Sequence, residues 1–206
     1  MGLRSSAPEL PGGSTPPFST CAHFLIAMAL LAASVVVPAG ELNGDAQEYQ
    51  VKAAVIYRIA KFVEWPLSGL EGGEISLCVI GEDPFGTGLE TIEGRFVHGR
   101  RLTPRRIDEL SDLPACDIAF VTLGEEPRLE EICAVAQEHH VLTVADSAGF
   151  GERCVVVNLI PQGRRIGFEL NYRAATRSRL RISSELLKLG TVLHGPRSPR
   201  RPRGSP

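Results

Sequence analysis

The first clear pattern of hydrophobic and polar positions lies between Tyr49 and Pro66, where apolar residues recur at intervals of three and four. The residues in this stripe are Val51, Ala54, Val55, Ile59, Phe62 and Val63. Such spacing predicts an amphipathic helix that buries one face. We expect the helix to begin at Asp45, which can cap free amide groups with Glu48 in capping-box position, and to end at Pro66. The only tryptophan, Trp65, supplies an aromatic anchor at that end.

Three short apolar runs predict strands that are buried on both faces. They cover residues 74–81, 116–123 and 141–145. Helical patterns at 85–95 and 127–140 separate these runs. The buried residues expected in these two helices are Leu89, Ile92, Leu129, Ile132, Cys133 and Ala136. Strands that alternate with helices predict a mostly parallel sheet covered on both faces.

Two further segments complete the expected sheet. Residues 101–106 predict an edge strand, because Pro104 lacks the amide hydrogen that a central strand needs. Residues 154–160 and 164–171 predict an antiparallel hairpin, since the Pro161–Gly163 segment between them has turn chemistry. The predicted fold class is therefore α/β: a three-layer sandwich of Rossmann-like appearance, with a mostly parallel sheet and an antiparallel C-terminal hairpin at its edge.

A last helix is predicted over residues 183–194, capped by Ser183 or Ser184. Its packing residues are expected to be Leu186, Leu187, Leu189 and Leu193. The tail at 196–206 is rich in proline and arginine, which predicts disorder.

The first 39 residues resemble a secretory leader. The apolar run from Phe24 to Val37 suits the apolar region of a signal peptide and is short for a bilayer span. Small residues at Val37 and Ala39 predict cleavage before Gly40. We therefore expect a leader at 1–39, one domain at 40–195 and export to the periplasm.

Charge excludes one class of partner. Residues 40–195 hold 17 Lys and Arg against 23 Asp and Glu, a net charge of about −6. Affinity for nucleic acid comes mainly from positive charge that meets phosphate. We therefore expect no nucleic-acid partner.

No motif in the chain predicts catalysis or a bound cofactor. The turn after the first strand has Gly81 and Gly86 at P-loop spacing but no lysine, and Glu82 and Asp83 would repel a phosphate. There is no Gly-x-Ser-x-Gly elbow and no Cys-x-x-Cys metal spacing. We expect no catalytic, cofactor-binding or metal-binding residues.

Export changes the meaning of the cysteines. Four of them follow the leader, at Cys78, Cys116, Cys133 and Cys154. Four cysteines permit three complete pairings, and an oxidising compartment favours at least one bond. The residues alone leave the pairing open.

Five arginines form the densest positive cluster in an otherwise acidic domain. They are Arg95, Arg100, Arg101, Arg105 and Arg106. Such a cluster can meet an acidic partner, or it can simply keep an edge strand soluble.

Short landmarks spread along the chain carry a resemblance to a known family. They include Lys52 and Ala53, the KFVEWP segment ending at Pro66, LCVIG with its DPFG turn, CDIAFV, LTVAD, GFELN and ISSELLKLG. In this order, from about Tyr49 to Leu193, they resemble the YfiR/HmsC-like family of small periplasmic proteins.

The resemblance implies a function by binding rather than catalysis. Members look like periplasmic inhibitors of an inner-membrane diguanylate cyclase, bound through its periplasmic sensor domain, often with an outer-membrane lipoprotein partner. The resemblance also implies a redox-sensitive disulfide between Cys78 and Cys116. The chain has no second cysteine close to Cys154, where the regulator it resembles has one. This leaves Cys154 free or paired with Cys133.

The leading hypothesis is a periplasmic protein that holds a diguanylate cyclase inactive, which lowers cyclic-di-GMP and biofilm formation. A homodimer stays open. The candidate partner-binding residues are Phe62, Trp65, Arg100, Arg101, Arg105 and Arg106. One alternative is a sensor of a small ligand held at the carboxyl ends of the central strands, near Gly81–Phe85 and Thr122–Gly124. The other alternative is an exported enzyme of unknown reaction.

Overall fold

The structure is a computed structural model that describes residues 40–66, 73–163 and 165–193. The predicted leader (1–39) and basic tail (196–206) lie outside these residues. Among the helices in the described parts of the chain, none combines the length and apolar character that a bilayer crossing requires.

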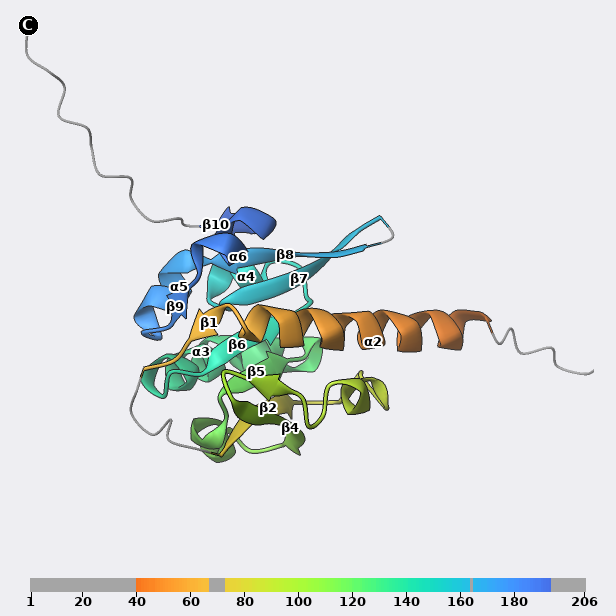
Figure 1. The fold of residues 1–206 in the computed structure, drawn as a ribbon, viewed down its shortest axis with the longest axis horizontal. Coiled ribbons are helices and arrows are strands. Elements are labelled where there is room, and N and C mark those ends of the chain that lie inside the picture. The colour runs from red at the N-terminus through yellow and green to blue at the C-terminus, as the bar shows by residue number, and fades with distance from the viewer. Residues whose placement is uncertain (1–39, 67–72, 164, 194–206) are drawn as a thin grey trace, which may run out of the picture. The chain divides into compact units, whose positions relative to one another are not determined.

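The centre of the fold is an eight-stranded sheet (Figure 1). Its strands, in spatial order, are β10 (Thr191–Leu193), β8 (Arg165–Asn171), β7 (Val157–Gln162), β6 (Leu142–Ala145), β5 (Ile118–Val121), β2 (Glu74–Ile80), β4 (Arg100–Ile107) and β3 (Phe96–Val97). Only the β7–β8 and β3–β4 pairs are antiparallel. The predicted α/β class, the mostly parallel sheet and the C-terminal hairpin are confirmed.

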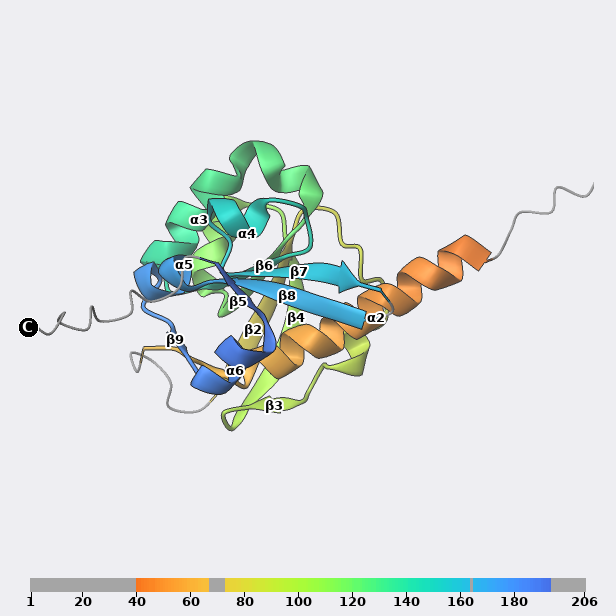
Figure 2. The ribbon, with the colours of Figure 1, turned by 90° about the horizontal axis from the view of Figure 1, so that it is seen from above.

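Helices cover both faces of the sheet, which makes three layers (Figure 2). The helix α2 (Gly40–Ala60) and the short α6 (Ser184–Leu189) lie on one face, whereas α3 (Leu129–Glu138) and α4 (Phe150–Arg153) lie on the other. Strand β2 alternates between them: Leu77 belongs to the core under α2 and Cys78 to the core under α3. Each Leu, Ile or Phe buried in these cores stabilises the fold by about 1.5–3 kcal/mol.

Shorter elements connect these layers. They are the 3₁₀ helices η1 (Gly88–Thr91), η2 (Leu110–Ala115) and η3 (Leu123–Arg128), the helix α5 (Tyr172–Arg177), and the strands β1 (Val63–Glu64) and β9 (Arg181–Ile182). Strands β1 and β9 pair antiparallel as a separate two-stranded sheet. The predicted inward residues Leu89, Ile92 and Leu129 are all buried.

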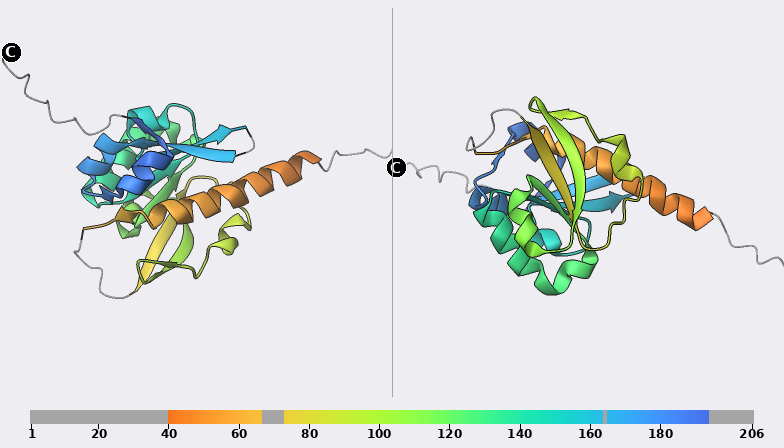
Figure 3. Two further views of the ribbon diagram at one scale, coloured as in Figure 1. Left: turned by 45° about the horizontal axis from the view of Figure 1, so that its top comes forward. Right: turned by 90° about the horizontal axis from the view of Figure 1, so that it is seen from below.

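The first helix differs from the prediction at both ends. In the described residues it begins at Gly40, five positions before Asp45, so Asp45 lies within the helix and does not cap it. It ends at Ala60, because Val63 and Glu64 pair with β9 well before Pro66. The amino-terminal part of α2 projects beyond the sheet (Figure 3).

The buried stripe of α2 is also shifted by one position from the expected one. Val51 is 45% exposed, whereas Lys52 is 6% exposed and Ala53 is fully buried. Ile56, Ile59 and Ala60 continue this stripe. The expected stripe began at the apolar Val51, whereas the buried face begins at Lys52. Because lysine is rarely buried, the pattern of apolar residues did not indicate this face.

The predicted last helix is corrected as well. Ser183 caps α6 through its side chain, as expected, but the helix stops at Leu189. Residues 191–193 instead form β10, parallel to β8. Strand β10 is therefore the edge of the sheet, and the hairpin lies one strand further in. Leu189 is 68% exposed rather than packed.

Candidate functional site

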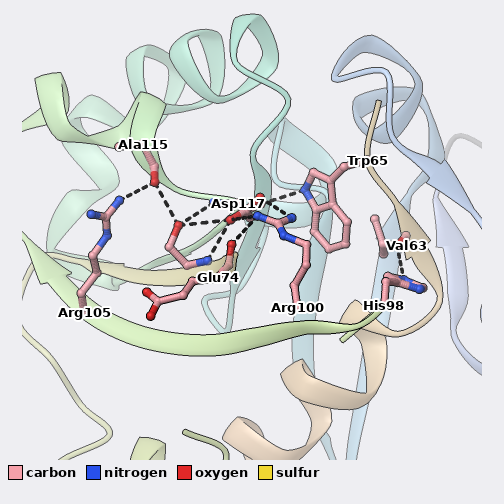
Figure 4. A network of polar contacts seen from close by, with 9 residues as sticks. Val63, Trp65, Glu74, His98, Arg100, Arg105, Ala115 and Asp117 are labelled. Carbon is pink, nitrogen blue, oxygen red and sulfur yellow. Dashed lines mark hydrogen bonds and ion pairs between the residues drawn. The ribbon is translucent and has the colours of Figure 1, made fainter. Parts of the chain in front are cut away.

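A network of polar contacts lies at the amino ends of the parallel strands (Figure 4). Its centre is Asp117, which directly precedes β5. Arg100, the first residue of β4, donates to both carboxylate oxygens of Asp117, at 3.0 and 3.1 Å. Ser76 of β2 donates to the same carboxylate from its backbone nitrogen at 2.8 Å and from its hydroxyl at 3.2 Å. Asp117 therefore ties together the starts of β5, β2 and β4.

Trp65 is fixed on one side of this network. Its indole nitrogen donates to the carbonyl oxygen of Asp117 at 3.1 Å. Its ring meets the ring of His98 edge-on, with centroids 6.5 Å apart. His98 is in turn held by the carbonyl oxygen of Val63, 2.9 Å from its Nε2 atom. The half-buried indole is thus held in one orientation, as an aromatic anchor requires.

Arg105 closes the other side of the network over a disulfide. Its Nε atom lies 3.2 Å from the sulfur of Cys78, and its guanidinium also contacts the sulfur of Cys116 at 3.6 Å. The carbonyl oxygen of Ala115 accepts a further hydrogen bond from it. Since Cys78 is fully buried and Cys116 is 5% exposed, Arg105 covers a disulfide that solvent barely reaches.

These residues line a polar groove of about 450 Å³, which we call the Trp65 groove. Its lining residues are Trp65, Pro66, Glu74, Ser76, Arg100, Arg105, Pro114, Ala115, Cys116, Asp117, His139 and His140. A second hollow of about 320 Å³, lined mainly by apolar atoms, lies beside Trp65 and includes Ile75, Val97 and His98. Trp65 and Arg100 line both hollows, so a polar and an apolar surface meet at this tryptophan.

The structure brings together only part of the predicted partner-binding set. Trp65, Arg100 and Arg105 meet in the Trp65 groove. Arg101 instead lies over the exposed ring of Phe96, 5.4 Å from its centroid. Arg106 pairs with Asp83 at the carboxyl end of β2, and its side chain is 65% exposed. The five-arginine cluster of the sequence is therefore divided between structural and solvent-facing roles.

Phe62 lies apart from the others. It lines an apolar hollow of about 460 Å³ between α2, β8 and α6, together with Ile166 and Leu186. Its backbone oxygen accepts from Ser183, which fixes α6 beside the end of α2. Phe62 and Trp65, both in the predicted partner-binding set, therefore line different hollows.

Both pairs of cysteines in the described residues are joined. Cys78 is bonded to Cys116 and Cys133 to Cys154, and in each pair the Cα atoms are 6.0 Å apart, a separation typical of disulfides. The first pair is the one that the family resemblance implied. The second is one of the two arrangements that the sequence left open.

A buried ion pair at the opposite end of the sheet escaped the sequence analysis. Lys52 of α2 lies 2.6 Å from Asp146, which follows β6, and 2.7 Å from Glu48. The hydroxyl of Tyr49 donates to Asp146 at 2.9 Å, and the Lys52 ammonium lies over the Tyr49 ring. The sequence does contain a signal for this pair: a lysine on an apolar helix face and an aspartate directly after a buried strand.

The environment of this cluster shifts two pKa values. Burial raises the pKa of Tyr49, and the negative charge of Asp146 raises it further. Burial alone would lower the pKa of Lys52, but its hydrogen bonds to Asp146 and Glu48 outweigh that effect and the pKa is raised. Lys52 therefore stays charged and Tyr49 neutral at physiological pH, and the cluster fastens α2 to the end of β6.

The region suggested for a small ligand is closely packed around Gly81 and Phe85. A Cβ atom at Gly81 would collide with the side chain of Thr122 and lie 2.9 Å from the Glu125 carboxylate. Phe85 is 2% exposed, because its ring packs edge-on against those of Tyr49 and Phe120. Within residues 40–66, 73–163 and 165–193, no group of three or more His, Cys, Asp or Glu side chains could hold a metal ion.

Comparison with known proteins gives one family match and several similar structures. The family model described as YfiR/HmsC-like matches residues 49–191, which include the Trp65 groove and both disulfides. A conserved domain protein from Vibrio cholerae O1 biovar El Tor is 12% identical with a TM-score of 0.46, and covers 70% of this chain. A domain in complex with L-Trp from Streptococcus pneumoniae is 9% identical with a TM-score of 0.47, also over 70% of this chain.

A third similar structure is a ligand-free, open substrate-binding protein with adhesive properties from Clostridium difficile. It is 9% identical with a TM-score of 0.42, over 58% of this chain. The chain spans 59%, 60% and 54% of the lengths of these three proteins, respectively.

Proposed function

Because this chain belongs to the YfiR/HmsC-like family, we propose that it is a periplasmic protein that binds the periplasmic sensor domain of an inner-membrane diguanylate cyclase and holds the cyclase inactive. The family match over residues 49–191 is the observation that carries this proposal. Membership supports a role as a periplasmic regulator of cyclic-di-GMP signalling. Repression of a cyclase, and the lower biofilm formation that follows from it, are our proposal for this chain.

Export is part of the same proposal. Residues 1–39 would act as the leader, and the domain at 40–195 would reach an oxidising compartment. Two joined cysteine pairs in the described residues suit such a compartment. An outer-membrane lipoprotein would be a second partner.

We assign the partner contact to the Trp65 groove and the adjoining strand β4. A half-buried tryptophan beside an apolar hollow provides contact area, and tryptophan and arginine are enriched among residues that dominate binding energy. Arg101 is exposed on β4, where it can attract an acidic surface and speed association; Arg106 is also largely exposed there, although Asp83 pairs with it. The remaining domain is acidic, so this stripe stands out as a positive patch.

Inhibition requires a difference in affinity between two states of the cyclase. A regulator shifts its partner's equilibrium only as far as it binds one state better than the other. A shift of the cyclase from 99% active to 99% inactive would need about 10⁴-fold preference for the inactive state. A well-ordered tryptophan and guanidinium set is suited to such discrimination, because it loses little freedom on binding.

The direct test is binding of the purified domain (residues 40–195) to the isolated periplasmic domain of the cyclase. Substitution of the buried Arg100 would disturb the fold through Asp117, so solvent-facing residues are the informative ones. We expect the double variant Arg101→Glu/Arg106→Gln, in which glutamine can still hydrogen-bond the buried Asp83, to weaken binding at least tenfold, mostly through slower association at low salt. Calorimetry and surface plasmon resonance measure both quantities.

Arg165→Glu provides the matched control, because Arg165 is an exposed strand arginine on β8, five strands away from β4. We expect this variant to bind like the unaltered protein. If all three proteins bound the cyclase domain with equal affinity, β4 would not be part of the contact. Failure of the unaltered domain to bind the cyclase domain would refute the proposed function itself.

A further inference from the structure

A hollow of about 290 Å³ lies among α3, α4 and α5, and it shares no lining residue with the Trp65 groove. Figures 1 and 2 both show these three helices gathered at one end of the sheet. Cys133 of α3 and Cys154, which follows α4, both line it. The Cys133–Cys154 disulfide therefore forms part of the wall of a hollow large enough for a small molecule.

The two disulfides differ in their exposure. Cys78 is fully buried, and Arg105 covers its bond to Cys116. Cys154 is partly exposed and lines the hollow, whereas its partner Cys133 is 9% exposed. Thiol–disulfide exchange needs access for the attacking sulfur. Cys154 is thus the most exposed of the four disulfide-bonded cysteines in the described structure.

The charge around the hollow is uneven. Arg173 and Arg177, one turn apart on α5, both line it, and neither forms an ion pair within the described residues. Arg153 also lines it, but its guanidinium is engaged by Glu130 at 2.7 and 2.8 Å. That hydrogen-bonded pair lowers the pKa of Glu130, so the pair persists at neutral pH.

One further carboxylate, Glu152, also lines the hollow and has no ion pair within the described residues. The two arginines of α5 outnumber it, so an excess of positive charge faces any molecule that enters. A negatively charged small molecule is therefore favoured over a neutral or positive one of the same size.

We propose that this hollow binds a small thiol that carries a negative charge, and that the bound thiol exchanges with the Cys133–Cys154 disulfide. This role is independent of the proposed contact at the Trp65 groove. It assigns redox sensitivity to Cys133–Cys154, which is accessible, rather than to the covered Cys78–Cys116 bond.

The exchange has two steps. The thiolate of the bound ligand attacks the sulfur of Cys154, the Cys133–Cys154 bond breaks, and its electron pair leaves on the Cys133 sulfur, which takes a proton from water. Cys154 is then held in a mixed disulfide with the ligand. A second ligand thiolate attacks the ligand sulfur, which releases the ligand disulfide and leaves Cys154 reduced. Two thiols are oxidised and one protein disulfide is reduced.

Reduction would free one end of the hollow. The bond joins α3 to Cys154, which directly follows α4. Helix α4 has only four residues, so little besides this bond holds its position. Loss of the bond unties a loop of 20 intervening residues that includes the whole of β6. The hollow, α4 and the attached Arg153 are then the parts of the fold expected to loosen first.

Three two-carbon thiols of similar size test the proposal. They are 2-mercaptoethanesulfonate (negative), 2-mercaptoethanol (neutral) and cysteamine (positive). The rate of Cys133–Cys154 reduction by each is followed by acid quench, alkylation and peptide mass, and is divided by the thiolate concentration. Rates with a small soluble disulfide correct for the intrinsic reactivity of each thiol.

We expect the negative thiol to react about fivefold faster than the neutral one at low salt, and the positive thiol more slowly than both. The Arg173→Glu/Arg177→Glu variant should abolish or reverse this order. Glu152→Gln should widen it, and Arg165→Glu should leave it unchanged. Cys78–Cys116 in the same samples should be reduced more slowly by all three thiols, because it is buried beneath Arg105.

Equal corrected rates for the three thiols would overturn the proposal. A charge preference that persists in the Arg173→Glu/Arg177→Glu variant would do the same, because it would place the charge effect elsewhere. If that double variant fails to fold, the rates measured with Glu152→Gln decide between the outcomes. This substitution introduces no new charged group and keeps both arginines, so a charge preference that does not widen would overturn the proposal. Faster reduction of Cys78–Cys116 than of Cys133–Cys154 would also contradict it.

Discussion

At the scale of single residues, the buried pair of Lys52 and Asp146 has the largest expected effect on stability. Lys52→Met removes the cation and leaves Asp146, whose side chain is 11% exposed, with only the Tyr49 hydroxyl as a described side-chain donor. A buried charge that loses its partner is strongly destabilising. We expect a loss of about 3 kcal/mol in the free energy of unfolding, measured by urea titration.

The control for this change is Lys188→Met, because Lys188 is an exposed lysine on α6. It should alter the free energy of unfolding by less than about 0.5 kcal/mol. Equal effects of the two substitutions would show that the Lys52–Asp146 pair adds nothing to stability.

The same cluster predicts a dependence on alkaline pH. The pKa values of both Lys52 and Tyr49 are raised in the folded state from ordinary values of 10.5 and 10.0. As pH rises above about 10, the unfolded chain loses these protons first, so it gains stability relative to the folded state. The contribution of both groups is therefore complete below about pH 9 and declines as pH rises through the folded-state pKa values.

Urea titrations of the domain between pH 8 and 11 measure this decline. We expect the free energy of unfolding to fall over that range, and to fall less steeply in the double variant Lys52→Met/Tyr49→Phe, which removes both titrating groups. A free energy that is constant or rising with pH, or an equal slope in the variant, would contradict the assigned role of the cluster.

The disulfides are also tested residue by residue. Peptide mapping without reduction should recover Cys78 linked to Cys116 and Cys133 linked to Cys154. In the chain-entropy account, closure of the 37-residue loop between Cys78 and Cys116 contributes about 3 to 4 kcal/mol. Recovery of any of the four cysteines as an alkylated thiol from oxidised protein would disprove that pairing.

For single residues, the sequence could indicate which side chains are candidates for binding but not which way they point. Trp65 was expected to be an anchor because it is the only tryptophan, and it lines both hollows. Arg100 and Arg101 are adjacent in sequence, yet one binds Asp117 and the other faces solvent. The distinction depends on Asp117, which is distant in sequence and brought near by the order of strands.

At the scale of elements, the helix ends separate what sequence patterns can predict from what tertiary pairing decides. The Ser183 cap was predicted correctly, because its signal is local: a side-chain oxygen that accepts from the Glu185 amide at 3.2 Å. The Asp45 cap was wrong, because the helix continues through it from Gly40. The same kind of sequence signal therefore had opposite outcomes.

This difference is measurable. Ser183→Ala should cost about 1 kcal/mol in the free energy of unfolding, because it removes a helix cap. Asp45→Ala should change it by less than about 0.5 kcal/mol, since alanine favours a helix interior. Thermal unfolding of the two variants beside the unaltered domain gives both values. A larger loss of stability in Asp45→Ala would instead support a helix that starts at Asp45, as the sequence pattern predicted.

The final segment shows how tertiary context overrides a local pattern. Residues 183–194 have helical spacing of leucines, but Gly190 ends α6 and the β-branched Thr191 and Val192 pair with β8. An open sheet edge offers hydrogen bonds that a helix end lacks. The presence of that edge depends on the β7–β8 hairpin and could not be read from residues 183–194 alone.

At the scale of the whole molecule, the sequence predicted the class and the layers because these depend on repeated signals. Buried apolar runs predicted the central strands β2, β5 and β6, and helical stripes predicted the cover on each face. The strand order places β4 beside β2 and β5 on its other side, which brings Arg100 to Asp117. The candidate site exists only through this order, which no local pattern encodes.

The molecule as a whole is proposed to act as an inhibitor, and inhibition is the property to measure. The full-length cyclase is reconstituted in membrane vesicles with its periplasmic side accessible, and cyclic-di-GMP synthesis is measured with increasing amounts of the oxidised domain. We predict saturable inhibition, with the Arg101→Glu/Arg106→Gln variant needing at least tenfold more protein and the Arg165→Glu control matching the unaltered domain. Undiminished synthesis in the presence of saturating folded domain would contradict the account.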